Sequence, residues 1–288
     1  MQSKTELYKL TCGLFNRQIM TTPTKVWLVG ILISLSVLFF GYEIAERWGL
    51  FIGFLIATNI NMMVFFFGKS NLLGKLNAKL IEGQDPWGLL PIIKEHSDKL
   101  HIEAPRLYVV DWDLPTAMTI GTYLKKGSIG VSTGLMKHLS KNEIRAVLAH
   151  QICQINRFDT LAFGVASVIA NSLLGFAAIA DEFWPFKFKF FVKIFSPFSW
   201  FIVRMTVNSK NYLRNDLDAV HLIEDKRDLA SALYKLENLA LASDQKIPPC
   251  TGHLFIVNPD QTQRENLFLH FQPELKSRIK NIIGTYPL

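Results

Sequence analysis

The sequence has few cysteines and no concentrated run of charge, and both absences narrow the functions open to it. Its three cysteines, Cys12, Cys153 and Cys250, are far apart and odd in number, so no disulfide framework is expected and a reducing environment suits the chain. The net charge of +7 arises from basic residues spread along the chain. Because a nucleic-acid-binding surface needs a basic stripe with interleaved aromatic residues, we expect no nucleic acid partner.

Long stretches without charge are what the sequence does contain. Hydrophobic residues make up 49% of the 288 residues, which is high for a soluble protein and low for a chain lying wholly in a membrane. Val26–Tyr42, Trp48–Gly68 and Leu161–Ala180 are free of charge and long enough to cross a hydrocarbon core of about 30 Å as helices. The link Glu43–Arg47 predicts a hairpin between the first two. A weaker fourth stretch, Phe190–Val203, either crosses the membrane or lies at its interface.

Lysine and arginine residues flank the predicted spans unevenly. Four precede the first span and three follow the second, whereas the link between the two spans carries only Arg47. The positive-inside rule therefore predicts a multi-pass membrane protein whose N-terminus and main soluble domain lie in the cytoplasm. The predicted segments are an N-terminal tail (1–25), a transmembrane hairpin (26–68), a first soluble part (69–160), a second hydrophobic hairpin (161–204) and a second, helical soluble part (205–288).

Residue patterns in the soluble parts predict helices and short strands. Pro86–Lys99 has apolar residues at helical spacing, while Arg106–Val110 and Ser128–Ser132 have the composition of strands. Ala117–Tyr123 is expected to pair with the second of these strands across a turn. Residues 243–260 contain three prolines and a glycine and are predicted to form a loop. We therefore expect a mainly α-helical chain with a small β-sheet in its soluble domain.

One helix of the first soluble part has a clear start. Ser140 and, three residues later, Glu143 form the pattern of a capping box, in which a hydroxyl and a carboxylate satisfy the exposed amides of the first turn. An apolar stripe follows at helical spacing, and the helix runs directly into the third predicted span. The stripe consists of Ile144, Val147, Leu148, Ile152 and Ile155.

His150 lies on this helix in a motif whose other functional positions are replaced. In a zincin site, histidines at i and i+4 project from one helical face onto one zinc ion, and the glutamate after the first histidine takes a proton from the zinc-bound water. Here the base position is Gln151 and the second ligand position is Gln154. A neutral amide cannot accept that proton, and zinc prefers imidazole, thiolate or carboxylate to an amide.

Several segments around His150 follow a known order. Val131–Leu135 ends in Ser-Thr-Gly-Leu, Ala146–His150 reads Ala-Val-Leu-Ala-His, and Asp159 precedes a span. Thr116–Gly121 occupies the place of an Asn-Ala-Phe-x-x-Gly strand. In this order, and with its N-terminal hairpin, the chain resembles the HtpX-like membrane zinc metalloproteases over nearly its whole length. The resemblance implies an α+β zincin-like cytoplasmic domain, with a small β-sheet beside an active-site helix, in a bacterial-type inner membrane.

The resemblance also implies a third zinc ligand, and this position is replaced too. The family has a Glu-x-x-Ala-Asp pattern, whose best match places Arg214 at the ligand position and Asp218 at the aspartate. A fixed cation there repels zinc, by about 4 kcal/mol per unit charge pair at ~4 Å and an effective dielectric of ~20. A slip of two residues would offer Asp216 instead. The family's C-terminal His-Pro-Pro is reduced to Phe-Gln-Pro at residues 271–273, with Arg278 following.

A rearranged metal site stays open as an alternative. Cys153 lies three residues after His150 on the same helical face. These two residues could hold a metal together with one further ligand from the second soluble part. The alternative is that Cys153 is simply a small buried residue. The candidates for the further ligand are Asp216, Asp218 and His221.

Three functions follow from these residues. The first is a pseudoprotease without a cofactor, which binds membrane or unfolded polypeptides, or regulates an active protease relative, and cleaves neither. The second is an active zinc-dependent endopeptidase with rearranged ligands, in protein quality control and the stress response. The third is a structural membrane subunit, whose partner is the lipid bilayer. The expected polypeptide site is a sheet edge, to which an extended chain can add as a strand, at Ala117, Met118, Thr119 and Gly121.

Overall fold

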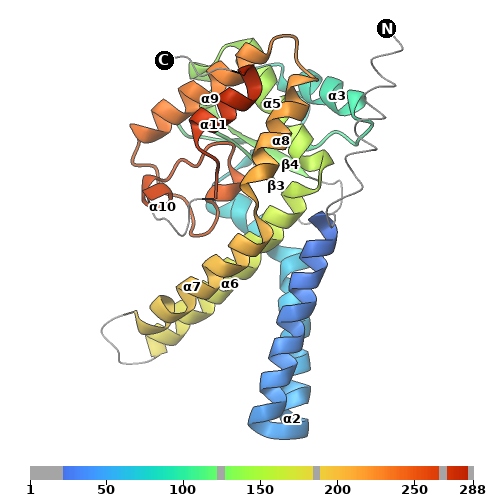
Figure 1. Ribbon diagram of the computed structural model, residues 1–288, viewed down its shortest axis with the longest axis vertical. Coiled ribbons are helices and arrows are strands. Elements are labelled where there is room, and N and C mark those ends of the chain that lie inside the picture. Colours follow the sequence, from blue (N-terminus) through green and yellow to red (C-terminus); the bar gives the residue numbers. More distant parts are fainter. Residues whose placement is uncertain (1–21, 122–126, 184–188, 266–270, 285–288) are drawn as a thin grey trace.

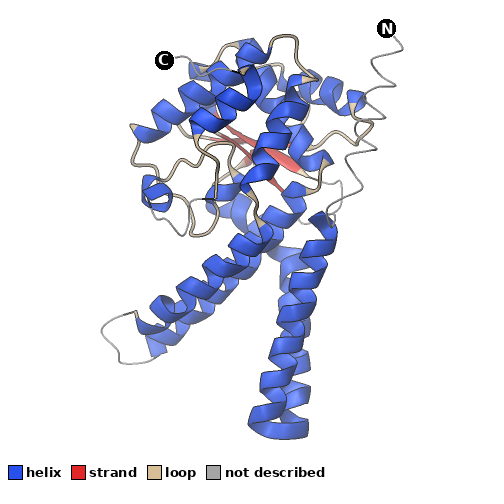
Figure 2. Cartoon of the chain, in the orientation of Figure 1, coloured by secondary structure: helices blue, strands red, loops and turns tan. Residues whose placement is uncertain are grey.

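Two helical hairpins extend from a head of helices and strands in the computed structural model (Figure 1). The structure describes residues 22–121, 127–183, 189–265 and 271–284, so most of the predicted N-terminal tail lies outside the described residues. Helices dominate both the hairpins and the head, and the strands form one small sheet inside the head (Figure 2). The predicted fold class, mainly α-helical with a small β-sheet, is confirmed.

The first hairpin is α2 (Thr22–Lys75), in which the chain reverses direction at Ala45 and Glu46. Their backbone angles are non-helical (φ −144°, ψ 27° and φ 46°, ψ −121°), which places the reversal inside the predicted link. Gly41 and Gly49 approach so closely across this turn that a Cβ atom on Gly49 would lie 1.7 Å from the carbonyl oxygen of Gly41. Glycine is needed here because no side chain fits between the two arms.

The second hairpin consists of α6 (Asp159–Phe183) and α7 (Phe190–Thr206). The Asp181 carboxylate near the end of α6 accepts hydrogen bonds from the backbone N–H groups of Phe191 (2.8 Å) and Val192 (3.0 Å), which ties the two helices together at their tip. α6 and the stretch Phe190–Val220 are long and apolar enough to cross a membrane. These correspond to the third and fourth hydrophobic stretches of the sequence.

Large apolar side chains on both hairpins are exposed. Phe40, Trp48 and Phe54 of α2 and Phe176 and Phe183 of α6 are each more than half exposed. Water disfavours so much apolar surface, whereas lipid covers it at no penalty. The hairpins therefore have the surface expected of helices that lie in a membrane.

The head is built on a four-stranded sheet with the order β1-β2-β4-β3. β1 (Lys79–Leu80) and β3 (Ala117–Ile120) pair antiparallel with their neighbours, whereas β2 (Arg106–Val110) and β4 (Ser128–Ser132) pair in parallel. The predicted pairing of β3 with β4 is confirmed, although residues 122–126, between the two strands, lie outside the described residues. The two-residue β1 is too short to show a periodic pattern and was not predicted.

Among the helices of the first soluble part, α5 (Lys141–Asn156) packs against both the sheet and the second soluble part. α3 (Leu89–Lys99) begins three residues later than predicted, because Gly88 adopts a left-handed conformation (φ 66°) immediately before it. The short α4 (Thr133–His138) connects β4 to α5. Only two residues separate α5 from α6. The helix that carries His150 thus runs almost directly into the third predicted span, as the sequence predicted.

Both soluble parts contribute to one core. α8 (Ser209–Val220), α9 (Lys226–Leu241) and α11 (Leu275–Ile283) lie in the head around α5 (Figure 1). Leu148 of α5 and Leu233 of α9 belong to the same buried apolar cluster. The stretch predicted as a loop, 243–260, is interrupted by the short helix η1 (Gly252–Leu254), and α10 (Gln261–Glu265) follows it.

Candidate functional site

The predicted capping box fixes the start of α5. Ser140 Oγ accepts a hydrogen bond from the backbone N–H of Glu143 (3.3 Å), and the Glu143 carboxylate accepts one from the backbone N–H of Ser140 (2.8 Å). The same carboxylate accepts a hydrogen bond from the hydroxyl of Ser231 (2.6 Å) and pairs with the ammonium of Lys235 (2.8 Å), both on α9. Glu143 therefore fixes the helix that carries His150 to the second soluble part.

His150 contacts a carboxylate on α8. Its Nδ1 lies 2.8 Å from Oδ1 of Asp216, and neither side chain has any exposed surface. Arg214 lies about 200° from Asp216 around the helix, on a half-buried face. Asp216, the residue that the alternative register offered, is therefore the one that lies beside His150, and Arg214 does not. The face of α8 that turns inward consists of Tyr212, Asn215, Asp216 and Ala219.

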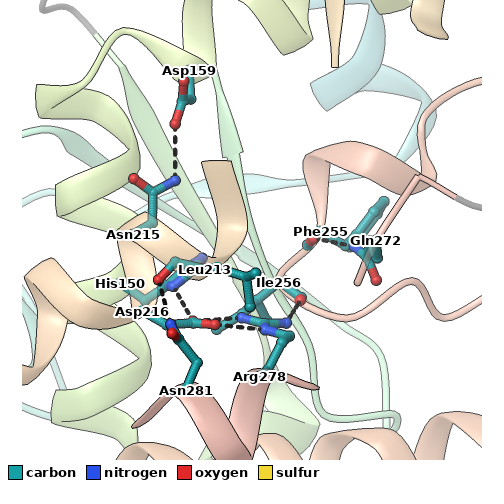
Figure 3. Close-up of polar contacts among 10 residues, drawn as sticks. All are labelled: His150, Asp159, Leu213, Asn215, Asp216, Phe255, Ile256, Gln272, Arg278 and Asn281. Atoms are coloured by element: carbon teal, nitrogen blue, oxygen red, sulfur yellow. Dashed lines mark hydrogen bonds and ion pairs between the residues drawn. The ribbon is translucent and has the colours of Figure 1, made fainter. Parts of the chain in front are cut away.

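Asp216 is also bound by Arg278 of α11. Nε and Nη2 of Arg278 donate to Oδ2 (2.8 Å) and Oδ1 (2.7 Å) of Asp216, and Nη1 donates to the carbonyl oxygen of Ile256 (2.7 Å; Figure 3). The guanidinium carbon lies 5.7 Å from the centre of the Tyr212 ring, within the range of a cation–π contact. His150, Asp216 and Arg278, all nearly or fully buried, are called the buried triad below.

Charges within the buried triad balance one another. Burial lowers the pKa of His150 and outweighs the effect of Asp216, so the imidazole is neutral at pH 7. Burial raises the pKa of Asp216, but the Arg278 guanidinium outweighs burial and holds that pKa well below its ordinary value. Burial likewise lowers the pKa of Arg278, and Asp216 more than compensates. The triad thus contains one carboxylate, one guanidinium and a neutral ring. The negative charge of the carboxylate is already balanced, so none remains to bind a further cation.

Gln151 and Gln154, at the base and second ligand positions, are fully buried on α5. Among the described residues, both amide atoms of Gln151, Nε2 of Gln154 and Nε2 of His150 have no hydrogen-bond partner. Such unpaired buried groups are rare in proteins and require an explanation, for example an ordered water. The helix therefore keeps polar side chains at the motif positions, but an amide cannot act there as a general base.

Of the residues of the rearranged metal site, the structure brings Asp216 to His150, whereas Asp218 and Cys153 make other contacts. Asp218 lies 2.7 Å from Nη1 of Arg157, in an ion pair, and Cys153 is buried within the apolar cluster of α5. Within the part of the chain that the structure describes, no three His, Cys, Asp or Glu side chains are grouped as a metal site would need. A catalytic zinc ion requires three protein ligands. His150 and Asp216 are two, and Arg278 occupies both oxygens of the second, so the donor set does not fit zinc.

Part of the sheet edge expected to bind polypeptide is covered by the same chain. Met118 of β3 forms an antiparallel bridge with Phe255, and the N–H of Ile256 donates to the carbonyl oxygen of Ala117 at 2.9 Å. β3 is the outermost strand of the sheet, as an edge requires, and two residues of the same chain lie along part of it. The four residues predicted for the edge, all of them buried, are Ala117, Met118, Thr119 and Gly121.

Sequence reasoning did not identify the roles of Arg278 and of Phe255 and Ile256. The sequence could have indicated the role of Arg278, because it lies within an apolar stripe of α11 and an arginine buried in such a stripe requires a partner. No such indication exists for Phe255 and Ile256, because they follow η1 in a stretch rich in proline. The other members of the stripe on α11 are Leu275, Ile279 and Ile282.

Comparison with known proteins agrees with the order of segments along the chain that the sequence analysis described. The profile of peptidase family M48 matches residues 89–285, more than half of the chain. A protein described as Protease HtpX homolog, from Campylobacter hominis, is 27% identical over 275 residues, which cover 90% of this chain and 96% of that protein. A protein of the same description from Persephonella marina is 27% identical over 282 residues, which cover 91% of this chain and 96% of that protein.

Among solved structures, that of S. mikatae Ste24p is similar at 17% sequence identity and a TM-score of 0.47. The similarity covers 90% of this chain and 66% of that chain. The family assignment rests on the sequence profile, which spans most of the head, and on relatives that align over nearly their whole length. The chain therefore belongs to peptidase family M48 and is an HtpX-like membrane metallopeptidase homologue.

Proposed function

We propose that this member of family M48 is catalytically inactive and binds membrane or unfolded polypeptides without cleaving them. The observation that carries the proposal is the pairing of both Asp216 oxygens with Arg278, beside His150 in the metal motif. A guanidinium is a permanent cation at any accessible pH. The protein therefore satisfies the carboxylate with its own positive charge.

Zinc binding would have to overcome this internal cation. Two unit charges about 4 Å apart interact by ~4 kcal/mol at an effective dielectric of about 20, and a divalent ion doubles the repulsion. Separating Arg278 from Asp216 first would leave buried charges unpaired, which typically costs about 3–5 kcal/mol. The chemistry would then still need a base, and a general base usually contributes about 10²–10⁴ in rate. Gln151 cannot act as that base. The unfavourable binding of zinc and the missing base are therefore two independent obstacles to catalysis.

A polypeptide is the partner that the head favours. The curated relatives are described as proteases, proteins that act on peptide bonds. In this chain β3 lies next to the motif helix. Its main-chain groups pair with an extended backbone, which in this structure is that of residues 255 and 256. Without cleavage, a bound chain is held and released intact. This activity suits an adaptor, or a regulator of an active protease relative in protein quality control.

The head is proposed to face the cytoplasm in a multi-pass arrangement. Lysines and arginines before the first predicted span and after the second support this orientation through the positive-inside rule. Asp244 is exposed on the head, so Asp244→Cys provides a reporter. A membrane-impermeant thiol reagent should label this variant only after the membrane is opened. Labelling in intact cells would place the head on the opposite side.

The function is tested with full-length protein purified in detergent or nanodiscs and a fluorescent, reduced and carboxymethylated polypeptide. We expect binding that saturates, no cleavage with or without added zinc, and no effect of a chelator. Chelator-sensitive cleavage that disappears in His150→Ala would contradict the proposal and support the active endopeptidase. Absence of binding under all conditions would also contradict it and leave the structural membrane subunit.

A further inference from the structure

The outer edge of β3 carries an extended segment of the same chain. Met118 and Phe255 form a single antiparallel bridge, and the N–H of Ile256 donates to the carbonyl oxygen of Ala117 (2.9 Å). Phe255 itself is extended (φ −85°, ψ 150°). The pairing is one bridge long, so it is far shorter than the ladder between β3 and β4. This segment, with its short pairing, occupies the position that an added strand would take.

The segment is held through its backbone and also through His253, whose Nε2 lies 3.1 Å from Ser167 Oγ and 3.0 Å from the carbonyl oxygen of Phe163. Gln272 Nε2 donates to the carbonyl oxygens of Phe255 (2.7 Å) and Gly252 (3.3 Å), and Gln272 Oε1 accepts from the N–H of Asn258 (2.8 Å). Arg278 Nη1 donates to the carbonyl oxygen of Ile256, as Figure 3 shows. Gln272 and Arg278 bind peptide units in these contacts and no particular side chain. They would recognise the backbone of any chain that lay in the same place.

The side chains of the segment supply the selectivity. The Phe255 ring stacks on Trp112 with the centroids 6.4 Å apart and the planes at 15°, and only 1% of Phe255 is exposed. Ile256 is fully buried in the apolar cluster that includes α5. An aromatic side chain followed by a branched aliphatic one therefore fits this edge. A polar or very small pair would leave both places unfilled.

We propose that residues 252–258 are a built-in occupant of the polypeptide site, and that partners bind by exchange with them. The inference rests on the proposed function and specifies its ligand: an extended segment with an aromatic residue followed by a branched aliphatic residue. Exchange is feasible because an incoming backbone restores the same bonds to Ala117, Gln272 and Arg278. The polar groups of Ala117, Gln272 and Arg278 that the departing segment exposes are therefore satisfied again.

The test compares Ile256→Pro with Ile256→Val in the full-length protein. Proline removes the N–H that bonds to Ala117, and the extended conformation of Phe255 is the one that precedes a proline without strain. Valine keeps the N–H and most of the apolar volume. The probe is a fluorescent peptide with the sequence of residues 251–258. We expect Ile256→Pro to bind it about tenfold more tightly than wild type, since one hydrogen bond and its packing oppose exchange. Ile256→Val should resemble wild type.

A second variant and a second peptide keep the result decisive. Gln272→Ala loosens the segment from the solvent side without touching β3, so it should also tighten peptide binding if Ile256→Pro does not fold. The same peptide with glycine in place of both Phe255 and Ile256 should bind at least about tenfold more weakly. Equal affinity of the two peptides, or no gain in either variant, would overturn the inference.

Failure of the inference differs from failure of the proposed function. If wild type binds the long unfolded polypeptide but hydrogen exchange at residues 252–258 stays unchanged on binding, the polypeptide binds elsewhere and only the inference fails. If neither wild type nor the loosened variants bind peptide or polypeptide, the proposed function fails as well. The expected result is faster exchange at residues 252–258 and unchanged protection of β3 in the complex.

Discussion

Both side-chain oxygens of Asp216 accept hydrogen bonds from the guanidinium of Arg278, at 2.7 and 2.8 Å. A bidentate pair of this kind is among the strongest that side chains form, and here it is buried. The carboxylate closest to His150 is therefore already neutralised from within the chain. In a metalloprotease a carboxylate in this place would help to hold the metal ion. Arg278 thus gives the motif helix a stable, metal-independent neighbour.

Removing the internal cation should destabilise the head. Arg278→Met leaves the buried Asp216 carboxylate without its cation and with only the neutral His150 beside it, so we expect a loss of about 3–5 kcal/mol in unfolding free energy, measured by thermal or denaturant unfolding of the purified protein. Arg214→Met is the matched control, because Arg214 lies on a half-buried face away from the triad. The control should change stability by less than about 0.5 kcal/mol. A larger loss in Arg214→Met than in Arg278→Met would contradict the geometry described here.

Restoring the motif positions should not restore zinc binding while Arg278 is present. We expect Gln151→Glu combined with Gln154→His to remain low in zinc by elemental analysis, because Arg278 still occupies Asp216. Adding Arg278→Met to that pair frees the carboxylate and should raise the zinc content. Equal zinc uptake with and without the third substitution would show that Arg278 does not control the site.

Close backbone packing between α6 and β3 should make Gly164 intolerant of a side chain. A Cβ atom there would lie 2.2 Å from the carbonyl oxygen of Gly121, a backbone atom that cannot move aside cheaply. Gly164→Ala should therefore reduce stability by about 1–3 kcal/mol. Gly175→Ala, on the same helix with nothing within 4 Å of the added Cβ, should leave the melting temperature unchanged or slightly raised. Equal melting temperatures for the two variants would contradict the packing.

Acid should weaken the contact between α5 and α9 through Glu143. Burial raises the pKa of Glu143, but hydrogen bonds from Lys235 and Ser231 outweigh it and hold the pKa below the ordinary value of 4.5. A carboxylate with a depressed pKa stabilises the fold above the unfolded-state value, and this stabilisation is lost as the pH falls through the folded-state value. The melting temperature of wild type should therefore fall below about pH 4.5 more steeply than that of Glu143→Gln.

The control for this titration is the exposed pair of Asp113 with Lys137. Asp113 is largely solvent-exposed, so its ion pair is screened and contributes little. Asp113→Asn should leave the pH profile of the melting temperature unchanged. If Asp113→Asn flattened the profile while Glu143→Gln did not, the acid sensitivity would arise outside the contact between α5 and α9.

Local patterns were sufficient to predict most of the elements of this fold. The capping box at Ser140 and Glu143 depends on residues three apart, and the structure contains both of its hydrogen bonds. The strands at 106–110 and 128–132 were likewise predicted from runs of apolar and β-branched residues. β1 and the left-handed start before α3 were missed, because two residues or one glycine carry too little periodicity.

Tertiary contacts were harder to predict than elements. Asp216 was only an alternative at the ligand position, because a degenerate motif does not fix the helical phase of α8. The pairing of Arg278 with Asp216 joins residues 62 positions apart, and no pattern within either helix specifies the partner. The segment at Phe255 and Ile256 pairs with β3 across an even longer separation. Its presence at the edge follows from the packed fold and from no local propensity.

Zinc content provides the most direct test of the internal-cation account. Full-length protein is purified without a metal-affinity tag, equilibrated with zinc, freed of unbound ions and measured by elemental analysis. The account predicts zinc far below one ion per chain, and the same content in His150→Ala and Asp216→Ala. One zinc ion per chain in wild type, lost in both variants, would contradict it.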